Sequence, residues 1–348
     1  MNQKTAAQAE MLANRLRKRY RHLKKWAART DAGAFRLYDR DIPEIPLVLD
    51  WYGGAVSGAL YKRPYEKDGE DEKRWIEEMR NAAARALEIP AGRVFIKFRE
   101  RKRGAAQYEK LSSGADAKGS GFIRDIREGG LVFRVNLSDY LDTGLFPDRR
   151  GLRDVVRKEA AGKRMLNLFC YTAAFSVCAA AGGAEETDSV DLSNTYLAWA
   201  GVNFSLNGFR AETVSEREAL YPAAAAPGIR VRHRLIRADA LLFLKHAAAA
   251  KRKWDLVIMD PPAFSNSRKM ASTLDIKRDH RELAASALRL LAPGGRLYFA
   301  AGVKNFRLET NGFPGFRAED IRARAADEDF PPNKAPSCYV FQNTDSST

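Results

Sequence analysis

Short apolar runs alternate with helical patterns from about residue 150 onwards, and this alternation restricts the possible folds more than any other feature. We expect strands at 164–169, 187–191, 233–237, 255–259 and 296–301. Helices are expected between them at 173–181, 193–207, 240–250 and 277–292, with a further helix near 317–327 and a strand at 337–342. Such alternation is typical of a parallel sheet with helices on both faces. The sequence therefore predicts a doubly wound, Rossmann-like α/β domain.

The first 140 residues follow a different pattern. Apolar residues recur at helical spacing between residues 9 and 30, which predicts an amphipathic helix. The following region mixes candidate strands at 47–51, 55–60, 94–99 and 131–135 with a candidate helix at 71–88. We therefore expect a basic N-terminal helix in 1–34, a small α+β domain over 35–140 and the Rossmann-like domain over 141–348. The stretch 210–230 is expected to be a surface excursion.

The net charge is +15, from 59 Lys and Arg against 44 Asp and Glu, and such an excess favours a polyanionic partner. Basic residues cluster on the N-terminal helix and in a loop that carries an aromatic residue, a combination that suits phosphates and an unstacked base. The expected RNA-binding residues are Arg15, Arg17, Lys18, Arg19, Lys97, Arg99, Arg101, Lys102, Arg103, Gln107 and Tyr108. The alternative is an ordinary solvated helix; a membrane-surface helix is disfavoured by the narrow apolar stripe.

Cysteine and histidine usage argues against a disulfide framework or a metal site. Cys170, Cys178 and Cys338 lie in apolar runs, so we expect them to be buried, as in a reducing cytosol. The four histidines are scattered, and no metal is expected. No stretch resembles a signal peptide or a membrane span, so we expect a cytoplasmic protein with no membrane partner.

The octapeptide 260–267, Asp-Pro-Pro-Ala-Phe-Ser-Asn-Ser, directly follows a buried apolar run. Open α/β sheets bind ligands at the carboxyl ends of their strands. The prolines fix the backbone beside the Asp260 carboxylate, and Phe264 offers a flat face to a base. We expect Asp260, Pro261, Pro262 and Phe264 to hold a planar, amine-bearing acceptor beside a methyl donor.

Three acids end successive expected strands, and together they describe a site for a nucleoside-bearing cofactor. Asp191 suits a ribose hydroxyl pair, although it could instead cap a helix, a role that Ser193 can also fill. Asp239 is placed to reach an adenine amine, and Asp260 marks the reactive end. A nicotinamide cofactor would use similar geometry, but the glycine-rich fingerprint is missing, with Ala173 where a glycine is expected. S-adenosylmethionine is therefore favoured.

Several segments together resemble the C-terminal module of the bacterial bifunctional 23S rRNA methyltransferases and, more distantly, the 23S rRNA 5-methylcytosine methyltransferases. The matching segments are Ala13–Lys18, Arg36–Asp39, Gln107–Leu111, Asn136–Phe146, Asn167–Thr172, Asp260–Ser267 and Arg278–His280. The resemblance implies a class I methyltransferase fold and formation of 7-methylguanosine in domain V of 23S rRNA. It implies S-adenosylmethionine as the cofactor.

The resemblance also implies that Asp142–Asp148 covers the methionine end of the cofactor. The expected cofactor-binding residues are Thr143, Gly144, Phe146, Asp148, Asn167, Phe169, Tyr171, Thr172, Asp191, Leu192, Asp239, Ala240 and Asp260. The chain departs from the family at Pro147, Arg149 and Ala173, where Leu, His and Gly are usual. The family's N-terminal guanine-N2 methyltransferase is absent from this sequence, which therefore resembles a stand-alone or excised version of the module. A separate guanine-N2 methyltransferase chain is a candidate partner.

Other activities stay open. Cytosine-C5 methylation typically needs a cysteine nucleophile, and no cysteine follows Pro262, whereas guanine-N2 methylation suits the same motif. A non-catalytic ribosome-assembly factor with a degenerate cofactor pocket is the non-enzyme alternative. A metabolic oxidoreductase is disfavoured by the charge. Because N7 is inaccessible in A-form RNA, the expected substrate is naked or early-assembling 23S rRNA with the target base unpaired.

Overall fold

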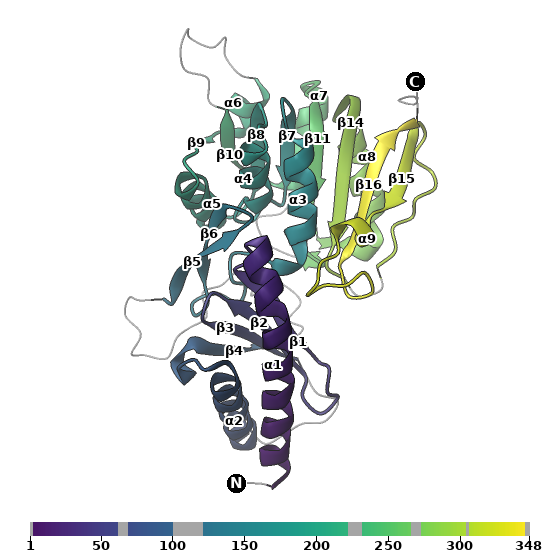
Figure 1. Cartoon of the computed structure of the whole chain (residues 1–348). Helices are drawn as coiled ribbons and strands as arrows, with labels where there is room; N and C mark the ends of the chain where they lie inside the picture. The colour runs from purple at the N-terminus through teal and green to yellow at the C-terminus, as the bar shows by residue number, and fades with distance from the viewer. Residues whose placement is uncertain are drawn as a thin grey trace. The chain divides into compact units, whose positions relative to one another are not determined.

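The computed structural model of the chain describes residues 3–61, 69–99, 121–221, 232–265, 273–303 and 306–344, the side chain of Arg99 excepted. The chain divides into two compact units, shown in Figure 1. The first unit comprises Met1–Lys102, Gln107–Asp148 and Glu328–Phe330, and the second comprises Arg103–Ala106, Arg149–Asp327 and Pro331–Thr348.

The first unit is a four-stranded sheet with two long helices and a separate hairpin. Its elements are α1 (Gln3–Thr30), β1 (Ala34–Asp39), β2 (Leu47–Tyr52), β3 (Val56–Tyr61), α2 (Gly69–Leu87), η1 (Ala91–Arg93), β4 (Val94–Arg99), β5 (Ile123–Glu128) and β6 (Leu131–Asn136). The sheet order is β1-β2-β3-β4, in which β3 and β4 run parallel. The strands β5 and β6 pair antiparallel.

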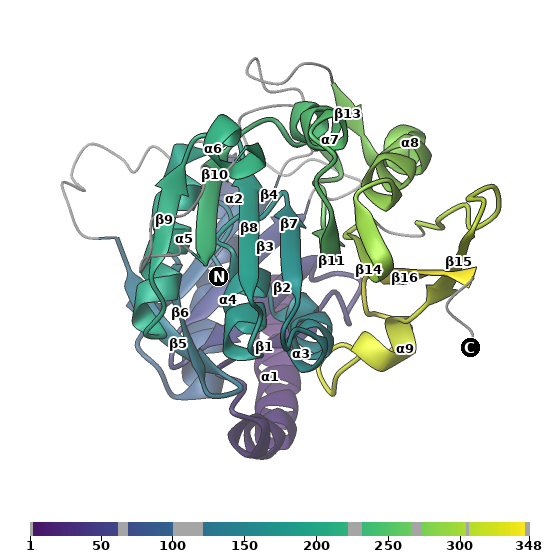
Figure 2. The ribbon, with the colours of Figure 1, turned by 90° about the horizontal axis from the view of Figure 1, so that it is seen from above.

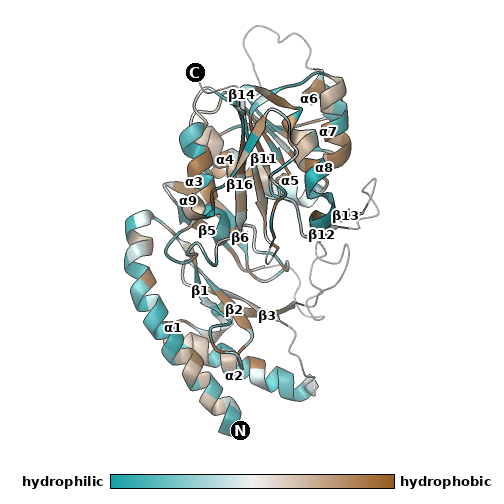
Figure 3. Ribbon diagram, turned by 90° about the vertical axis from the view of Figure 1, so that its right-hand side faces the viewer, coloured by the Kyte–Doolittle hydropathy of each residue, from teal (hydrophilic) through white to brown (hydrophobic). Residues whose placement is uncertain are grey.

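Helices α1 and α2 share one apolar core with this sheet. The stripe predicted for α1 is confirmed, because Leu12, Leu16, Leu23 and Trp26 are all buried. Figure 3 shows the remaining surface of α1 as largely hydrophilic. The helices are also joined by a hydrogen bond of 2.7 Å, which the buried Trp75 indole N–H donates to Gln8.

The second unit is the predicted doubly wound domain. Its helices are α3 (Arg150–Glu159), α4 (Ala174–Ala181), α5 (Asn194–Leu206), α6 (Glu216–Leu220), α7 (Ala240–Ala249), α8 (Ile276–Leu288) and α9 (Arg322–Ala325). Its strands are β7 (Arg164–Leu168), β8 (Glu186–Asp191), β9 (Ala211–Val214), β10 (His233–Arg237), β11 (Trp254–Met259), β12 (Phe264–Ser265), β13 (Leu274–Asp275), β14 (Leu291–Ala301), β15 (Phe316–Asp320) and β16 (Ser337–Asn343). A 3-10 turn, η3 (Pro147–Arg149), leads into α3.

The large sheet has the order β15-β16-β14-β11-β7-β8-β10-β9. The strand β16 pairs antiparallel with both of its neighbours, β14 and β15, and the other neighbouring strands pair parallel. Alternate residues of its central strands face two cores. On β11, Leu256 and Ile258 pack with α3 and α4, while Val257 and Met259 pack with α7 and α8. Figure 2 shows these helix pairs on opposite faces of the sheet. The predicted class I fold is therefore confirmed.

Some expectations about single elements are wrong. The segment expected as a helix at 317–327 contains the edge strand β15 and only the short helix α9. Part of the expected excursion at 210–230 is an edge strand, β9, which pairs parallel with β10. The strand β14 already begins at Leu291 and runs through Pro293–Gly295, where Gly294 adopts a φ of 70°. An edge strand is solvated on one side, so its polar residues do not show the apolar run of a buried strand.

All three cysteines are buried, as predicted. Within the described ranges, no group of three or more His, Cys, Asp or Glu is arranged to hold a metal ion. None of the helices in the described part of the chain has the length and apolar character needed to cross a membrane.

Candidate functional site

The strand register brings the predicted site residues of the second unit into one row. Leu168 at the end of β7 pairs with Val190 of β8 on one side and Met259 of β11 on the other. The next residue of each strand, Phe169, Asp191 and Asp260, therefore lies at the same carboxyl edge. The chain leaves β7 toward β8 on one side and returns to β11 on the other, so this edge is the switch point where such sheets bind ligands. The ends of β8 and β11 are two strand spacings apart, so Asp191 and Asp260 are separated by about 10 Å along the edge of the sheet.

The loop after β7 has an unusual backbone. Phe169, Tyr171 and Ala173 all adopt positive φ angles, of 55°, 53° and 57°, a conformation that non-glycine residues rarely adopt. Hydrogen bonds hold the loop in this form. The Cys170 N–H donates to the Val190 carbonyl, and the Asn203 side chain on α5 donates to the Thr172 carbonyl at 3.0 Å. Ala173 thus keeps the left-handed conformation that favours glycine.

Asp191 is held by backbone donors rather than used as a helix cap. Its carboxylate accepts hydrogen bonds from the N–H groups of Tyr171 at 3.0 Å and Ser193 at 2.9 Å. The cap of α5 is Ser193, whose hydroxyl accepts from the Tyr196 N–H. Burial raises the pKa of Asp191 to about 6, although its backbone donors act in the opposite direction.

Asp239 follows β10 and caps the next helix. One of its oxygens accepts from the N–H groups of Leu241 at 2.8 Å and Leu242 at 3.3 Å, and Ala240 is the first residue of α7. Leu192 is half-buried beside Asp191. Asp239 therefore caps α7. Its predicted contact with an adenine remains a proposal.

Asp260 is engaged by an arginine that the sequence argument left without a role. The Arg149 Nε lies 2.7 Å from one Asp260 oxygen, and its Nη2 lies 2.9 Å from the other. Past Asp260, the motif turns back on itself, because β12 pairs with β13 and the Ile276 N–H donates to the Ala263 carbonyl. Pro261 is buried, while Pro262 and Phe264 are half-buried; Asn266 and Ser267 lie outside the described residues.

Two predicted cofactor residues have side chains turned into the protein. The Asn167 amide donates to Ser176 at 2.9 Å and is 1% exposed, and Ser189 donates to the same Ser176 hydroxyl. Thr172 is fully buried. Both residues shape the loop, so any contact they make with a ligand would come from their backbone.

The predicted cofactor residues at 143–148 belong to the first unit. Thr143 is buried, and its hydroxyl shares a 2.8 Å hydrogen bond with Tyr52. The positive φ of Gly144, 98°, is one that favours glycine, and Phe146 is 36% exposed. Asp148 lies in η3 and is half-buried.

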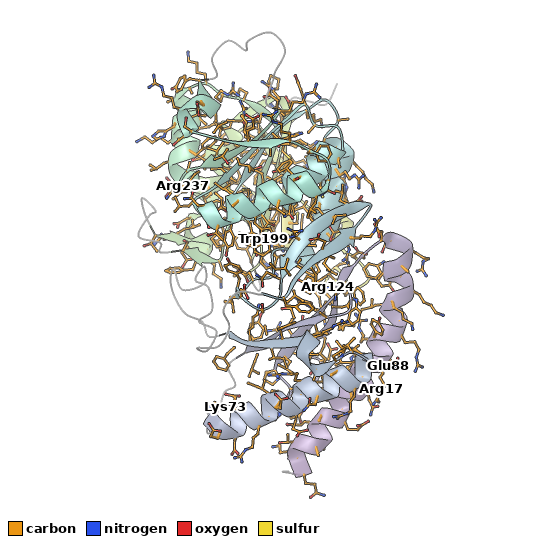
Figure 4. The ribbon with its side chains drawn as sticks, turned by 90° about the vertical axis from the view of Figure 1, so that its left-hand side faces the viewer. Arg17, Lys73, Glu88, Arg124, Trp199 and Arg237 are labelled. Carbon is orange, nitrogen blue, oxygen red and sulfur yellow. The ribbon has the colours of Figure 1, made fainter. Side chains whose placement is uncertain are left out.

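The predicted RNA-binding residues have different surroundings. Arg17 and Lys18 are exposed on α1, where Figure 4 labels Arg17, whereas Arg15 is half-buried and paired with Asp41, and Arg19 is half-buried. Lys97 is buried and donates to the Tyr140 carbonyl, so its ammonium is not on the surface. For Arg99, the structure describes only the main chain. Arg101, Lys102, Arg103, Gln107 and Tyr108 lie outside the described residues.

Sequence reasoning missed two residues that organise this edge, Arg149 and Asn203. The only signal for Arg149 was its departure from the usual family residue. The structure also supports the view that Cys170 is a packing residue, since burial raises the pKa of its thiol well above the ordinary value and so opposes thiolate formation.

Comparisons with known proteins show what the chain is similar to. A family model described as "S-adenosylmethionine-dependent methyltransferase" matches residues 35–220. The chain is 42% identical to ribosomal RNA large subunit methyltransferase K of Neisseria meningitidis, over 95% of this chain and 86% of that protein. It is 39% identical to ribosomal RNA large subunit methyltransferase K/L of Allochromatium vinosum, over 98% of this chain but only 43% of that protein. Among solved structures, SMU.776 complexed with SAH has a TM-score of 0.71 at 22% identity, covering 96% of this chain and 81% of that one.

Proposed function

Because the chain belongs to the S-adenosylmethionine-dependent methyltransferase family that includes ribosomal RNA large subunit methyltransferase K, we propose that it methylates N7 of a guanine in domain V of 23S rRNA. The observation that carries the proposal is the row formed by Phe169, Asp191 and Asp260 at the switch point of the sheet. It offers a half-buried acid for a nucleoside at one end and the Asp-Pro-Pro-Ala-Phe turn for an acceptor base at the other.

The residues present fit S-adenosylmethionine. The Asp191 carboxylate belongs to a half-buried residue at a strand end, where two ribose hydroxyls can donate to it. We propose that Leu192, Asp239 and Ala240 border the adenine and that the backbone of 169–172 borders the methionine end. The cofactor supplies an electrophilic methyl group on a sulfonium. Thr143, Gly144, Phe146 and Asp148 keep their proposed cofactor role.

The protein's task in the reaction is then mainly to position the acceptor. Guanine N7 has a lone pair and no proton, so no residue has to act as a base. We propose that Asp260 accepts hydrogen bonds from the guanine N–H groups and that the Pro261 and Pro262 turn keeps this acceptor fixed. Phe264 can stack on the base, and its face favours the cationic product by about 0.5–2 kcal/mol. Accurate positioning of this kind supplies up to about 7–11 kcal/mol of barrier reduction in well-oriented systems.

We propose that the RNA is held partly by the exposed basic face of α1. Arg17 and Lys18 lie on this face, and each phosphate contact releases counterions. A target base must be extruded or unpaired before it reaches the strand edge, which favours naked or early-assembling rRNA. The match covers 43% of the length of the K/L relative. We also propose a separate guanine-N2 methyltransferase chain as a partner.

The proposal is tested by incubating the protein with protein-free 23S rRNA and methyl-labelled S-adenosylmethionine, followed by nucleoside mass spectrometry. We expect label in 7-methylguanosine, and none with Asp260→Ala, which should still bind RNA. Label in 5-methylcytidine or N2-methylguanosine would refute the N7 assignment. Cofactor binding by calorimetry without any transfer would instead favour the assembly-factor alternative.

A further inference from the structure

Arg149 and Asp260 form a two-point ion pair at the carboxyl edge of the sheet. The contacts of 2.7 and 2.9 Å join Nε and Nη2 to the two carboxylate oxygens, and the two side chains are only 9% and 19% exposed. Such parallel hydrogen bonds fix the plane of a carboxylate as well as its position. Asp260 is therefore held in a single orientation by a residue 111 positions away in the sequence.

Three elements of the second unit prepare the position of the guanidinium. Arg149 is the N-cap residue of α3, which packs on the same face of the sheet as Ile258 and Cys338. Gly302, which directly follows β14, lies beside the guanidinium, because a β-carbon built on it would be 3.4 Å from Arg149 Nη2, an ordinary van der Waals contact. Burial raises the pKa of the neighbouring Cys338 thiol, so this thiol stays neutral beside the ion pair. The negative charge of Asp320 also raises the pKa of Cys338.

The pairing changes what Asp260 can do in the reaction. A carboxylate has about four lone-pair directions, and Arg149 occupies two of them, so about two remain for N–H donors of a base. The pair as a whole carries no net charge. Stabilisation of a cationic product by the isolated charge of Asp260 is therefore weak, whereas orientation of the base by fixed acceptor directions is strong.

We propose that Arg149 is a positioning residue for methyl transfer, which acts by holding the Asp260 carboxylate in the orientation that receives the acceptor base. This inference rests on the proposed methyltransferase function and adds to it a residue that departs from the family's usual histidine. A histidine has one N–H to give to the carboxylate from a given side and cannot fix its plane in the same way.

The test is a variant series, Arg149→Lys, Arg149→His and Arg149→Met, assayed with methyl-labelled S-adenosylmethionine and 23S rRNA. We expect kcat to fall in that order, by about 100-fold for Arg149→Met, because small misplacements of a reacting group have effects of this size. The dissociation constant for S-adenosylmethionine should change little. Added guanidinium ion should raise the kcat of Arg149→Met about tenfold, since the free ion can re-form the two-point contact with Asp260.

Two controls separate positioning from a general structural role. Arg296→Met removes an ion pair with Glu159 from the same unit, and Arg296 lies in the middle of β14 and pairs with a different acid from Arg149, so the kcat of this variant should be nearly normal and insensitive to guanidinium. In a double-mutant cycle, Arg149→Met should have little further effect in an Asp260→Asn background, because Arg149 acts through Asp260.

The outcomes are distinguishable. A folded Arg149→Met protein with normal kcat, or one with a loss that guanidinium does not relieve, would overturn the role of Arg149; if that variant does not fold, Arg149→Lys with unchanged kcat would do the same. Methylation of a different atom by the wild type would refute the N7 proposal. The variant series would then still test the role of Arg149, through the kcat of that other methylation. Complete absence of transfer by the wild type would overturn both.

Discussion

The Asp191 carboxylate accepts a hydrogen bond from the Tyr171 N–H at 3.0 Å, and this contact ties the end of β8 to the left-handed loop after β7. One residue therefore shapes the loop and presents a half-buried acceptor at the edge proposed to bind the ribose. Because strained backbone persists only where its surroundings hold it, the contact links the conformation of the loop to the charge state of Asp191.

Cofactor affinity should depend on pH through Asp191. Burial raises the pKa of this carboxyl to about 6, so the protonated form dominates below that pH in the unliganded protein. Ribose hydroxyls favour the ionised form, and binding should therefore strengthen as pH rises toward 6, by at most about tenfold per pH unit, and level off above. Calorimetric titration between about pH 5 and pH 8 measures this, with Asp191→Asn as the variant that should lose the dependence. A flat profile in the wild type would contradict the role of Asp191.

The same raised pKa has a consequence for folding stability. A group with a pKa higher in the folded than in the unfolded state contributes its full stability below the unfolded value of about 3.8. That contribution is lost as pH rises through about 6. Replacing Asp191 by Asn should therefore stabilise the unliganded protein more at neutral pH than at pH 4, which denaturant unfolding at the two pH values can determine.

Asp239 has a measurable role as a helix cap and a proposed one in adenine binding, and Asp239→Ser separates them. Serine caps a helix as well as aspartate, so the free energy of unfolding should stay within about 0.5 kcal/mol of the wild type. The shorter neutral side chain cannot replace a charged hydrogen bond to the adenine amine, so the dissociation constant for S-adenosylmethionine should rise by about tenfold or more. Unchanged affinity would leave Asp239 as a cap alone.

Ala173 is fully buried and adopts a φ of 57°, so Ala173→Gly has two opposing effects. Loss of the buried methyl group costs about 0.8 kcal/mol, while relief of the left-handed conformation returns about 1–2 kcal/mol, offset by the greater freedom of glycine in the unfolded chain. We expect a net change close to zero in a denaturant titration.

The matched control is Ala179→Gly, which removes an equally buried methyl group from the interior of α4, a regular helix. Here no strain is relieved, and the expected loss is about 1.5–2 kcal/mol. If Ala173→Gly destabilised the protein as much as Ala179→Gly does, the loop would not be strained at Ala173.

The basic face of α1 should contribute to the salt dependence of RNA binding. Arg17, Lys18 and Arg21 are exposed on this helix. Replacing all three by Ala should make the slope of log affinity against log salt shallower by about 2, if each contacts one phosphate of unpaired RNA. The control is Lys73→Ala on α2, where the ammonium is already paired with Glu70 at 2.7 Å. An unchanged slope in the triple variant would remove α1 from the RNA footprint.

The helices and buried strands of this fold can be predicted from the sequence because the apolar pattern of each lies within one short segment. Buried parallel strands such as 254–259 stand out as apolar runs, and the motif that begins at Asp260 follows directly. The edge strand β15, by contrast, has polar residues on its solvated side, so its sequence lacks the apolar run that identifies a buried strand. The pairing of Arg149 with Asp260 spans 111 residues and leaves no local pattern, so only the folded chain brings the two together.

Mass-spectrometric mapping of 23S rRNA from cells that lack the protein tests the claim that the protein forms 7-methylguanosine in 23S rRNA. We predict the loss of one 7-methylguanosine in domain V, restored by the wild-type protein and not by the Asp260→Ala variant. An unchanged 7-methylguanosine content, or the loss of a methyl group from a different base or atom, would contradict the claim.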